Sequence, residues 1–485
     1  MSKFNKTVKT EKVASYEGGE VYEKNPVEDW INFLMSSYLE DQFYESASDQ
    51  MNRYMDLTRE VAEKYGWEFV AKAAFFSRQE LGMRSISEFT AAILNGQKLD
   101  NKRAFFRNYF KRPDGLAEVF SLLDNFLGSK RSHALVRGAG DYLSSLGDYQ
   151  MGKYKMKGKE YNMYDLINIT HAHSATIDRY KAGTLETPDT WETAISGSKS
   201  DEEKSQNWQR LIEESKLGYL ALIRNLRNIV NSSPDADWIE KYLVPQIENE
   251  AAIKKSLVFP YQIYCSWKNY SIRNISIDAA LDRAFRIACG NMPKIDGRTA
   301  IILDVSGSME DKLSSNSSLT LKEVGAVYAA AMFVNCNADF IKFGNEAKKL
   351  KLNKLDSIFN LVEKMYANDN CGYGTDIVPA FCLMNEKYDR IFLVSDMQIM
   401  SNNDSEWYWR RQNGIETYNG YCKAYKCYPH MYSFDLSNYS TQVENPNNPR
   451  IHLLTALNDT LFKMLPYIEN GNSLVDYINN NFSYC

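Results

Sequence analysis

The segment from Thr299 to Met309 (TAIILDVSGSM) constrains the fold of this chain more than any other stretch. Its run of apolar and β-branched residues is typical of a strand that is buried on both faces of a parallel sheet. Asp304, Ser306 and Ser308 follow that strand at spacings of two residues. Open α/β sheets bind their ligands at the carboxyl ends of the strands. The segment therefore predicts an α/β domain with a cluster of oxygen ligands at one sheet edge.

The Asp-x-Ser-x-Ser pattern after a strand resembles the metal-ion-dependent adhesion site of von Willebrand factor A domains. That resemblance implies a threonine from a second loop and an aspartate after a later strand. The glycine-rich segment CGYGTD carries Thr375, and the buried-strand pattern RIFLVSD ends in Asp396. The three segments stand in the order of that family, so together they indicate an A domain more strongly than any one of them.

Carboxylate and hydroxyl oxygens are hard donors, which suit Mg²⁺, Mn²⁺ or Ca²⁺ better than zinc. We therefore expect a divalent metal, with Mg²⁺ as the first choice, at Asp304, Ser306, Ser308, Thr375 and Asp396. In A domains such a site leaves an open position that a carboxylate of a partner fills. A Ser/Gly-rich turn that caps the next helix remains the alternative.

Strand and helix patterns alternate after this segment, which predicts a parallel-sheet, Rossmann-like domain. Helices are expected at 319–336, 355–366, 377–384, 407–425, 461–465 and 474–482, with strands at 340–343, 390–396, 430–434 and 451–454. Catalysis is not expected. A strand that ends in Asp304 resembles the haloacid-dehalogenase phosphatases, but those enzymes need a second acid where this chain has Ser306. The sequence also lacks a phosphate-binding loop, an HExxH motif and a convincing nucleophile elbow.

Residues 25 to about 290 have an almost wholly helical pattern that starts at Asn25-Pro26, an N-cap followed by proline in the first turn. Helices are expected at 55–81, 86–94, 102–110, 115–127, 132–146, 162–169, 188–196, 206–230 and 236–247. Many helices of similar length with short links favour divergent HEAT-like pairs stacked as an α-solenoid. An irregular helical domain without repeats is the alternative.

Several of these helical segments resemble the TROVE domain of the Ro ribonucleoprotein family: SISEFTAAILNG from Ser85, TWETAISG from Thr190, GYLALIRNLRNI from Gly218, and DLINITH, which ends in His171. A TROVE domain followed by an A domain is also the order of that family. The resemblance implies a closed ring of helices that binds a small noncoding Y-like RNA and the single-stranded 3′ ends of misfolded RNA. For bacterial members it also implies exoribonuclease-dependent RNA processing or quality control.

The net charge of −5 conceals a basic segment, because residues 101–160 carry 12 Lys and Arg against 6 Asp and Glu. Within it, lysines alternate with other residues in KYKMKGK. Such a loop is either a solvated surface or a surface that contacts phosphates. By resemblance to the Ro family, the RNA contacts are Lys153, Lys157 and His171, with Lys155, Arg224 and Arg227 as further candidates. Solvated helix faces remain the alternative for these two arginines.

We therefore predict an N-terminal arm at 1–24, a helical TROVE domain at 25–292 and a von Willebrand factor A domain at 293–485. No apolar run approaches the roughly 18 residues of a membrane span, and the N-terminus lacks the apolar core of a signal peptide. Eight cysteines are too sparse for a disulfide scaffold and favour free thiols. A monomeric, cytoplasmic RNA-binding protein is expected. The rival is an A-domain adaptor that recognises an acidic protein through its metal and has no RNA role.

Overall fold

The computed structural model describes residues 12–42, 44–154, 156, 158–185, 191–232, 235–256, 258–270, 272–290, 292, 295–315, 317–400, 417–455, 460–471 and 473–485. The chain forms two compact units that interleave in sequence. The sheet unit comprises Met1–Asn32, Glu40–Ala47 and Ile212–Glu469, and the helical unit comprises Phe33–Leu39, Ser48–Leu211 and Asn470–Cys485. The predicted boundary between functional domains near residue 292 stays a prediction.

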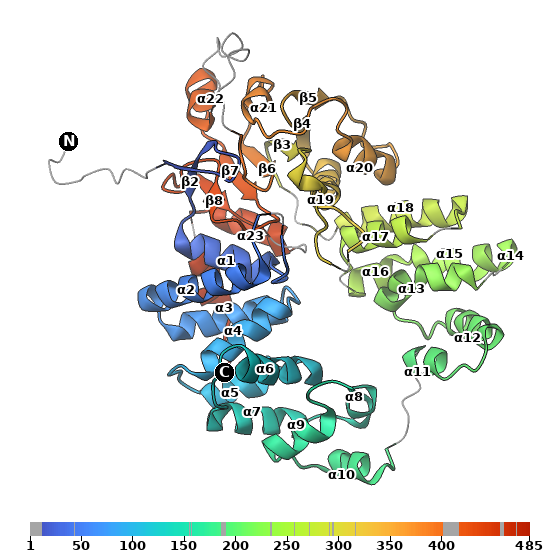
Figure 1. The fold of residues 1–485 in the computed structure, drawn as a ribbon. Helices are drawn as coiled ribbons and strands as arrows, with labels where there is room; N and C mark the ends of the chain where they lie inside the picture. The colour runs from blue at the N-terminus through green and yellow to red at the C-terminus, as the bar shows by residue number, and fades with distance from the viewer. Residues whose placement is uncertain are drawn as a thin grey trace. The chain divides into compact units, whose positions relative to one another are not determined.

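A six-stranded sheet is the centre of the sheet unit, with the order β5-β4-β3-β6-β7-β9. Neighbouring strands are parallel except for β5, which pairs with β4 in the antiparallel direction at one edge. The strand order reverses between β3 and β6, which lie side by side (Figure 1). The strands are β3 Arg298–Asp304, β4 Asn337–Phe343, β5 Ala347–Leu350, β6 Arg390–Val394, β7 His430–Phe434 and β9 Ile451–Leu453. The predicted α/β region with a parallel sheet is confirmed, and β5 is an edge strand that the sequence analysis missed.

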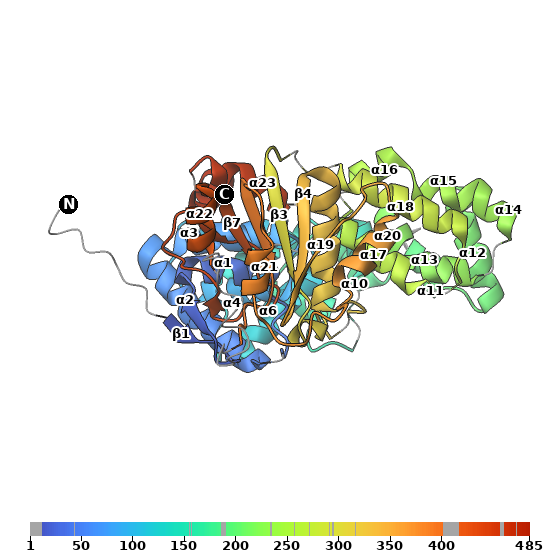
Figure 2. The same cartoon turned by 90° about the horizontal axis from the view of Figure 1, so that it is seen from above.

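Helices cover both faces of this sheet because successive strand residues alternate between the two faces. Ile302, Phe381 and Tyr421 share one core cluster, which places α21 (Val378–Cys382) and α22 (Tyr418–Tyr425) against one face. On the other face, the ring of Tyr328 in α19 lies 5.1 Å from that of Phe434. Figure 2 shows α19 and α21 on opposite sides of β3. The remaining helices of this α/β part are α19 Leu321–Asn335, α20 Ile358–Tyr366 and α23 Thr460–Glu469, together with the 3-10 turn η2 Ser308–Glu310.

A small antiparallel sheet joins the beginning of the chain to a segment after β7. Its strands are β1 Lys12–Ala14, β2 Glu20–Glu23 and β8 Thr441–Gln442, in the order β1-β2-β8. Val21 is fully buried in the core cluster that α21 and α22 share. From Lys12 on, the predicted N-terminal arm is therefore a β-hairpin that Val21 anchors to the core.

The sheet unit also holds a group of helices from both sides of residue 212. Helix α1 (Pro26–Ser36) begins in this unit, and Asn25 caps it as predicted by accepting a 3.1 Å hydrogen bond from the backbone of Val27. Helix α17 packs against α13, α18 and α19. The other helices are α13 Tyr219–Asn231, α14 Ala236–Trp238, the π-helix η1 Ile239–Leu243, α15 Val244–Ile247, α16 Glu250–Ser256, α17 Pro260–Asn269 and α18 Ile275–Cys289.

Helices of the helical unit pack on helices one or two places further along the chain, as α3 does on α4, α5 on α7, and α7 on α9. Glycines in α7 allow two of these approaches. A Cβ at Gly138 would lie 2.5 Å from the carbonyl oxygen of Arg103, and one at Gly140 would lie 2.7 Å from that of Thr170. The helices are α2 Ala47–Tyr65, α3 Trp67–Gln79, α4 Ser85–Asn95, α5 Lys102–Tyr109, α6 Pro113–Asn125, α7 His133–Ser144, α8 Asp148–Lys153, α9 Met163–Thr170, α10 Ala175–Ala182, α11 Trp191–Ser196, α12 Asp201–Glu213 and α24 Leu474–Asn481.

Two long predicted helices are wrong as single helices. The stretch 55–81 divides into α2 and α3 at Gly66, whose φ of 84° ends the first helix. The stretch 206–230 divides into α12 and α13, and Ser215 between them has a φ of 51°. Residues 407–416 of one predicted helix and 188–190 of another lie outside the described residues. Within the described chain no helix is long and apolar enough to cross a bilayer, and none of its eight cysteines forms a disulfide.

Candidate metal centre and nucleic-acid interface

Asp304 ends strand β3 at the point where the strand order of the sheet reverses. Its side chain is fully buried, and both carboxylate oxygens accept hydrogen bonds. The backbone N–H of Ser306 donates to Oδ1 over 2.8 Å, and the hydroxyl of Ser395 donates to Oδ2 over 2.6 Å. Ser395 directly precedes Asp396 and was not among the predicted residues. Its position at the end of β6 is the signal that could have found it.

Backbone hydrogen bonds tie the three predicted loops together. Gly307 donates to the carbonyl of Tyr373 over 2.8 Å, and Met400 donates to that of Thr375 over 3.1 Å. The hydroxyl oxygens of Ser306 and Ser308 lie 3.4 Å apart. The Ser308 hydroxyl also hydrogen-bonds the carboxylate of Asp396, which opposes in part the rise in the pKa of Asp396 that burial causes. The structure therefore brings Asp304, Ser306, Ser308, Thr375 and Asp396 to one edge of the sheet, and all five side chains are buried.

Thr375 gives the clearest sign that this cluster accepts a ligand. Its Oγ1 atom is buried and has no hydrogen-bond partner among the described residues. An unpaired buried hydroxyl costs about 1–3 kcal/mol, so a native structure normally satisfies it. No group of three or more His, Cys, Asp and Glu side chains in the described chain is arranged to hold a metal. The donor set here is two carboxylates and three hydroxyls, which fits a hard cation such as Mg²⁺.

The electrostatics of the two aspartates also fit a cation. Burial raises the pKa of Asp304 to about 6, against the hydrogen bonds from Ser395 and Ser306, which lower it. Burial, followed by the charge of Asp304, raises the pKa of Asp396 well above its ordinary value. Two buried carboxylates this close resist ionising together unless a positive charge joins them. Asp376, which follows Thr375, accepts a 3.0 Å hydrogen bond from the N–H of Val378 in the first turn of α21.

Lys153, the first of the predicted RNA contacts, lies at the C-terminal end of α8. Its ammonium forms a 2.8 Å ion pair with Glu192 and lies 5.6 Å from the centroid of the Tyr149 ring. The hydrogen bond from Lys153 to Glu192 raises the pKa of the lysine. An RNA phosphate would therefore have to share the Lys153 ammonium with Glu192 or displace Glu192 from it. Lys155 and Lys157 lie outside the described residues, so their positions are not part of this geometry.

His171 ends α9 in the left-handed conformation, with a φ of 54°. Its side chain is exposed, and its ring makes no hydrogen bond to a residue of the described chain. Arg224 and Arg227 lie on the exposed face of α13, one helical turn apart, and neither guanidinium has an ion-pair partner within the described chain. An exposed imidazole and two free guanidiniums are groups that can contact phosphates and bases.

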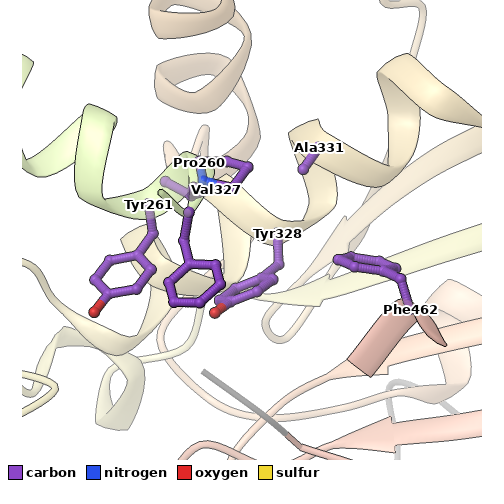
Figure 3. A pocket seen from close by; sticks show the side chains of 7 residues that line it. Pro260, Tyr261, Val327, Tyr328, Ala331 and Phe462 are labelled. Carbon is purple, nitrogen blue, oxygen red and sulfur yellow. The ribbon is translucent and has the colours of Figure 1, made fainter. Parts of the chain in front are cut away.

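A separate hollow in the sheet unit has an apolar and aromatic lining (Figure 3). The rings of Phe259 and Tyr261 stack there with centroids 6.3 Å apart and planes 7° apart. The hollow is lined by Phe259, Pro260, Tyr261, Val327, Tyr328, Ala331 and Phe462. It offers no carboxylate to a metal and is distinct from the oxygen cluster at the sheet edge.

Comparisons with known proteins agree with this architecture. Residues 151–276 match the model of the TROVE domain. The fold is similar to that of the Ro (RSR) protein of Deinococcus radiodurans, with a TM-score of 0.62 and 13% identity over 93% of this chain and 100% of the other. No curated protein matches the sequence.

The chain is thus a two-part protein in which a TROVE-bearing helical region precedes an α/β region with a parallel sheet. More particularly, it has the fold of a Ro protein, and the predicted resemblance to the Ro ribonucleoprotein family is confirmed at the level of domain and fold. All six candidate RNA contacts, Lys153, Lys155, Lys157, His171, Arg224 and Arg227, fall inside the matched range 151–276.

Proposed function

We propose that this protein binds RNA in the manner of Ro proteins. The observation that carries the proposal is the TROVE match at residues 151–276 within a chain that has a Ro fold over 93% of its length. The ligands would be a small structured noncoding RNA of the Y type and the single-stranded 3′ ends of misfolded RNA. The role would be cytoplasmic RNA processing or quality control with an exoribonuclease as partner, and the protein itself would be a non-catalytic monomer.

Two kinds of side chain support a division of labour within the matched range. Arg224 and Arg227 project from α13 without partners in the described chain, so they can neutralise phosphates at no cost in broken ion pairs. His171 offers an exposed ring at a fixed backbone position. Phosphate contacts position an RNA, and rings and base edges add selectivity. We assign the arginines to the first role and His171 to the second.

A HEAT-like ring is the architecture that the Ro resemblance implies for the helical region. Such a ring would present an outer surface to structured RNA and a hole to a single strand. A duplex is too wide for that hole, so a free unpaired end would be selected. The packing of helices on others one or two places along the chain within the helical unit is compatible with this proposal.

We also propose that the α/β region is a von Willebrand factor A domain that holds Mg²⁺. Asp304 and Asp396 would supply negative charge, and Ser306, Ser308 and Thr375 would supply neutral oxygens. A bound cation would act as a charged bridge to an acidic group of a partner. The unpartnered hydroxyl of Thr375 is the structural feature that supports this assignment.

Calorimetry with Mg²⁺ and Mn²⁺ tests the metal site. Asp304→Ala should abolish binding and leave both units folded by circular dichroism. The matched control is Asp356→Ala, which removes a carboxylate that pairs with Lys364 in the same unit and should bind as the wild type does. Equal metal binding by the wild type and Asp304→Ala would refute the assignment.

Copurifying nucleic acid separates the RNA-binding proposal from the adaptor alternative. An RNA-binding protein purified at low salt should show an excess absorbance at 260 nm that RNase removes. An adaptor should instead be free of RNA and should retain an acidic protein only while the metal is present. The second outcome would move the function to the α/β region alone.

A further inference from the structure

The ammonium of Lys153, at the end of α8, is paired with an acid from a later helix of the same unit. Its Nζ lies 2.8 Å from Oε1 of Glu192 in α11. The exposed fraction of the side chain is 30% for Lys153 and 33% for Glu192, so solvent reaches the pair only in part. The ammonium also donates a 3.4 Å hydrogen bond to the hydroxyl of Tyr149. The lysine that we propose as an RNA contact is therefore already neutralised by a carboxylate.

Lys153 belongs to a small cluster of cations and aromatic rings. Its Nζ lies 5.6 Å from the centroid of the Tyr149 ring and 5.9 Å from that of the Tyr154 ring. The guanidinium carbon of Arg112 lies 5.0 Å from the same Tyr154 centroid, and Arg112 is paired with Asp114 at 2.7 Å. Cations beside exposed rings are groups that contact phosphates and stack on unpaired bases. In this protein, however, each of the two cations has a partner acid.

Glu192 is held beside Lys153 by the contacts that α11 makes with α12. The ring of Trp191 stacks on that of Trp208, with centroids 5.9 Å apart and planes 26° apart. The side-chain amide of Asn207 donates a 3.2 Å hydrogen bond to a backbone carbonyl of α11. Because the carboxylate belongs to an anchored helix of the same chain, its effective concentration at the ammonium is high. A carboxylate and a phosphate also offer an ammonium the same kind of charged oxygen.

We propose that Glu192 is a specificity-determining residue of the RNA-binding surface: its carboxylate occupies the place of an RNA phosphate at Lys153 and must leave before RNA contacts this lysine. The inference rests on the proposed RNA binding and goes beyond it, because it names the group that the RNA replaces. A ligand with a single negative charge gains no more from Lys153 than Glu192 already does. A strand that makes several phosphate contacts at once compensates for the lost ion pair. Glu192 therefore favours long polyanions such as RNA over short acidic ligands.

Fluorescence anisotropy with a labelled RNA hairpin that carries a single-stranded 3′ tail tests this proposal. Glu192→Gln keeps the size of the side chain and removes its charge. This variant should bind the hairpin about threefold more tightly than the wild type, which matches the modest contribution of a partly exposed ion pair. The slope of log affinity against log salt should also become steeper by up to about one unit. The phosphate at Lys153 then releases its counterion, and no uncovered carboxylate takes one up.

The matched control is Asp201→Asn, which removes the same charge from the first turn of α12. The Asp201 side chain is 93% exposed and pairs with Lys204 of its own helix, so this variant should keep the wild-type affinity and slope. A second control places Glu192→Gln in a Lys153→Ala background. There the substitution should no longer change the affinity, because the ammonium for which carboxylate and phosphate compete is gone.

The possible outcomes separate this inference from the proposed function. An absence of RNA binding by both the wild type and Glu192→Gln would overturn the inference and the RNA-binding proposal together. RNA binding that Glu192→Gln leaves unchanged in affinity and slope would overturn the inference alone, as would a gain that persists in the Lys153→Ala background. Weaker binding by Glu192→Gln would also overturn it, since Glu192 would then position Lys153 for RNA instead of competing with RNA.

Discussion

Replacing Lys24 by Met should cost the sheet unit a large part of its stability. The ammonium of Lys24 lies 2.7 Å from Oδ2 of Asp435 and 3.2 Å from Oδ1 of Asp29. The exposed fraction of the side chain is 1% for Lys24, 0% for Asp435 and 5% for Asp29. Met keeps the length of the side chain but removes its charge. Asp435, just after β7, would then keep a buried negative charge without its cation.

The structure sets the size of the effect. Removing one partner of a buried ion pair costs about 3–5 kcal/mol. Asp435 retains hydrogen bonds from the backbone of Ser437 at 2.9 Å and of Asn438 at 3.1 Å. Because these bonds still stabilise its charge, the decrease in the free energy of unfolding should lie at the lower end of that range. We therefore expect a decrease of about 3 kcal/mol in the free energy of unfolding. Lys12→Met is the control, because its partner Glu20 lies in the same small sheet and is exposed. Exposed pairs contribute less than about 1 kcal/mol.

Urea unfolding followed by tryptophan fluorescence measures both variants, since Trp30 in α1 is fully buried in this unit. The double variant Lys24→Met with Asp435→Asn should recover part of the loss, because the unpaired charge is gone. A decrease for Lys24→Met no larger than that for Lys12→Met would refute the argument. The argument would also be refuted if the double variant lost more unfolding free energy than the two single variants lose together.

Three further predictions concern pH, packing and RNA. His452, whose ring lies 3.0 Å from that of His430, has a pKa lowered to about 4 by burial. As the pH falls, His452 is therefore protonated in the unfolded chain before it is protonated in the folded protein. The free energy of unfolding is highest above pH 6.5 and decreases as the pH falls toward 4. The loss should reach about 2 kcal/mol at pH 5 at about 1.4 kcal/mol per unit, and His452→Phe should flatten this dependence in urea unfolding. Gly138→Ala should destabilise the helical unit by about 1–3 kcal/mol in the same assay, because α5 leaves no room for a methyl group; unchanged stability would contradict that packing. Replacing Arg224 and Arg227 with Ala should lower the slope of log affinity against log salt by about one to two units, whereas an unchanged slope would show that neither touches phosphate.

Local patterns predicted the sheet and the placement of its polar loops. The apolar run before Asp304 and the one before Asp396 each read as a buried strand, and parallel neighbours necessarily end at the same edge. The hydroxyls of Ser306 and Ser308 follow at fixed spacing, so their position depends only on the end of β3. These relations are short-range or follow from the strand order, so they could be predicted from the sequence.

Long-range contacts were beyond the reach of sequence patterns. The turn between β1 and β2 contacts the loop after β6 through Tyr16 and Gln398, which are 382 residues apart in the sequence. A polar hairpin whose buried apolar side chain is that of Val21 alone among its described residues has no distinct periodicity. The break at Gly66 was missed because the apolar stripe continues through it, and a glycine inside a helical pattern is often tolerated. The roles of Lys153 and His171 in RNA binding remain predictions. Lys153 already pairs with Glu192, and no contact of the His171 ring with the described chain identifies its ligand.

The central claim, that this protein binds RNA as Ro proteins do, is tested most directly by comparing two hairpins in a filter-binding assay. One carries a single-stranded 3′ tail, and the other has the same stem and loop with a blunt end. We predict tighter binding of the tailed hairpin, competition by a saturating Y-like RNA, and no dependence on added metal. Equal affinities for the two hairpins would contradict recognition of a free 3′ end, and no binding of either would contradict the claim as a whole.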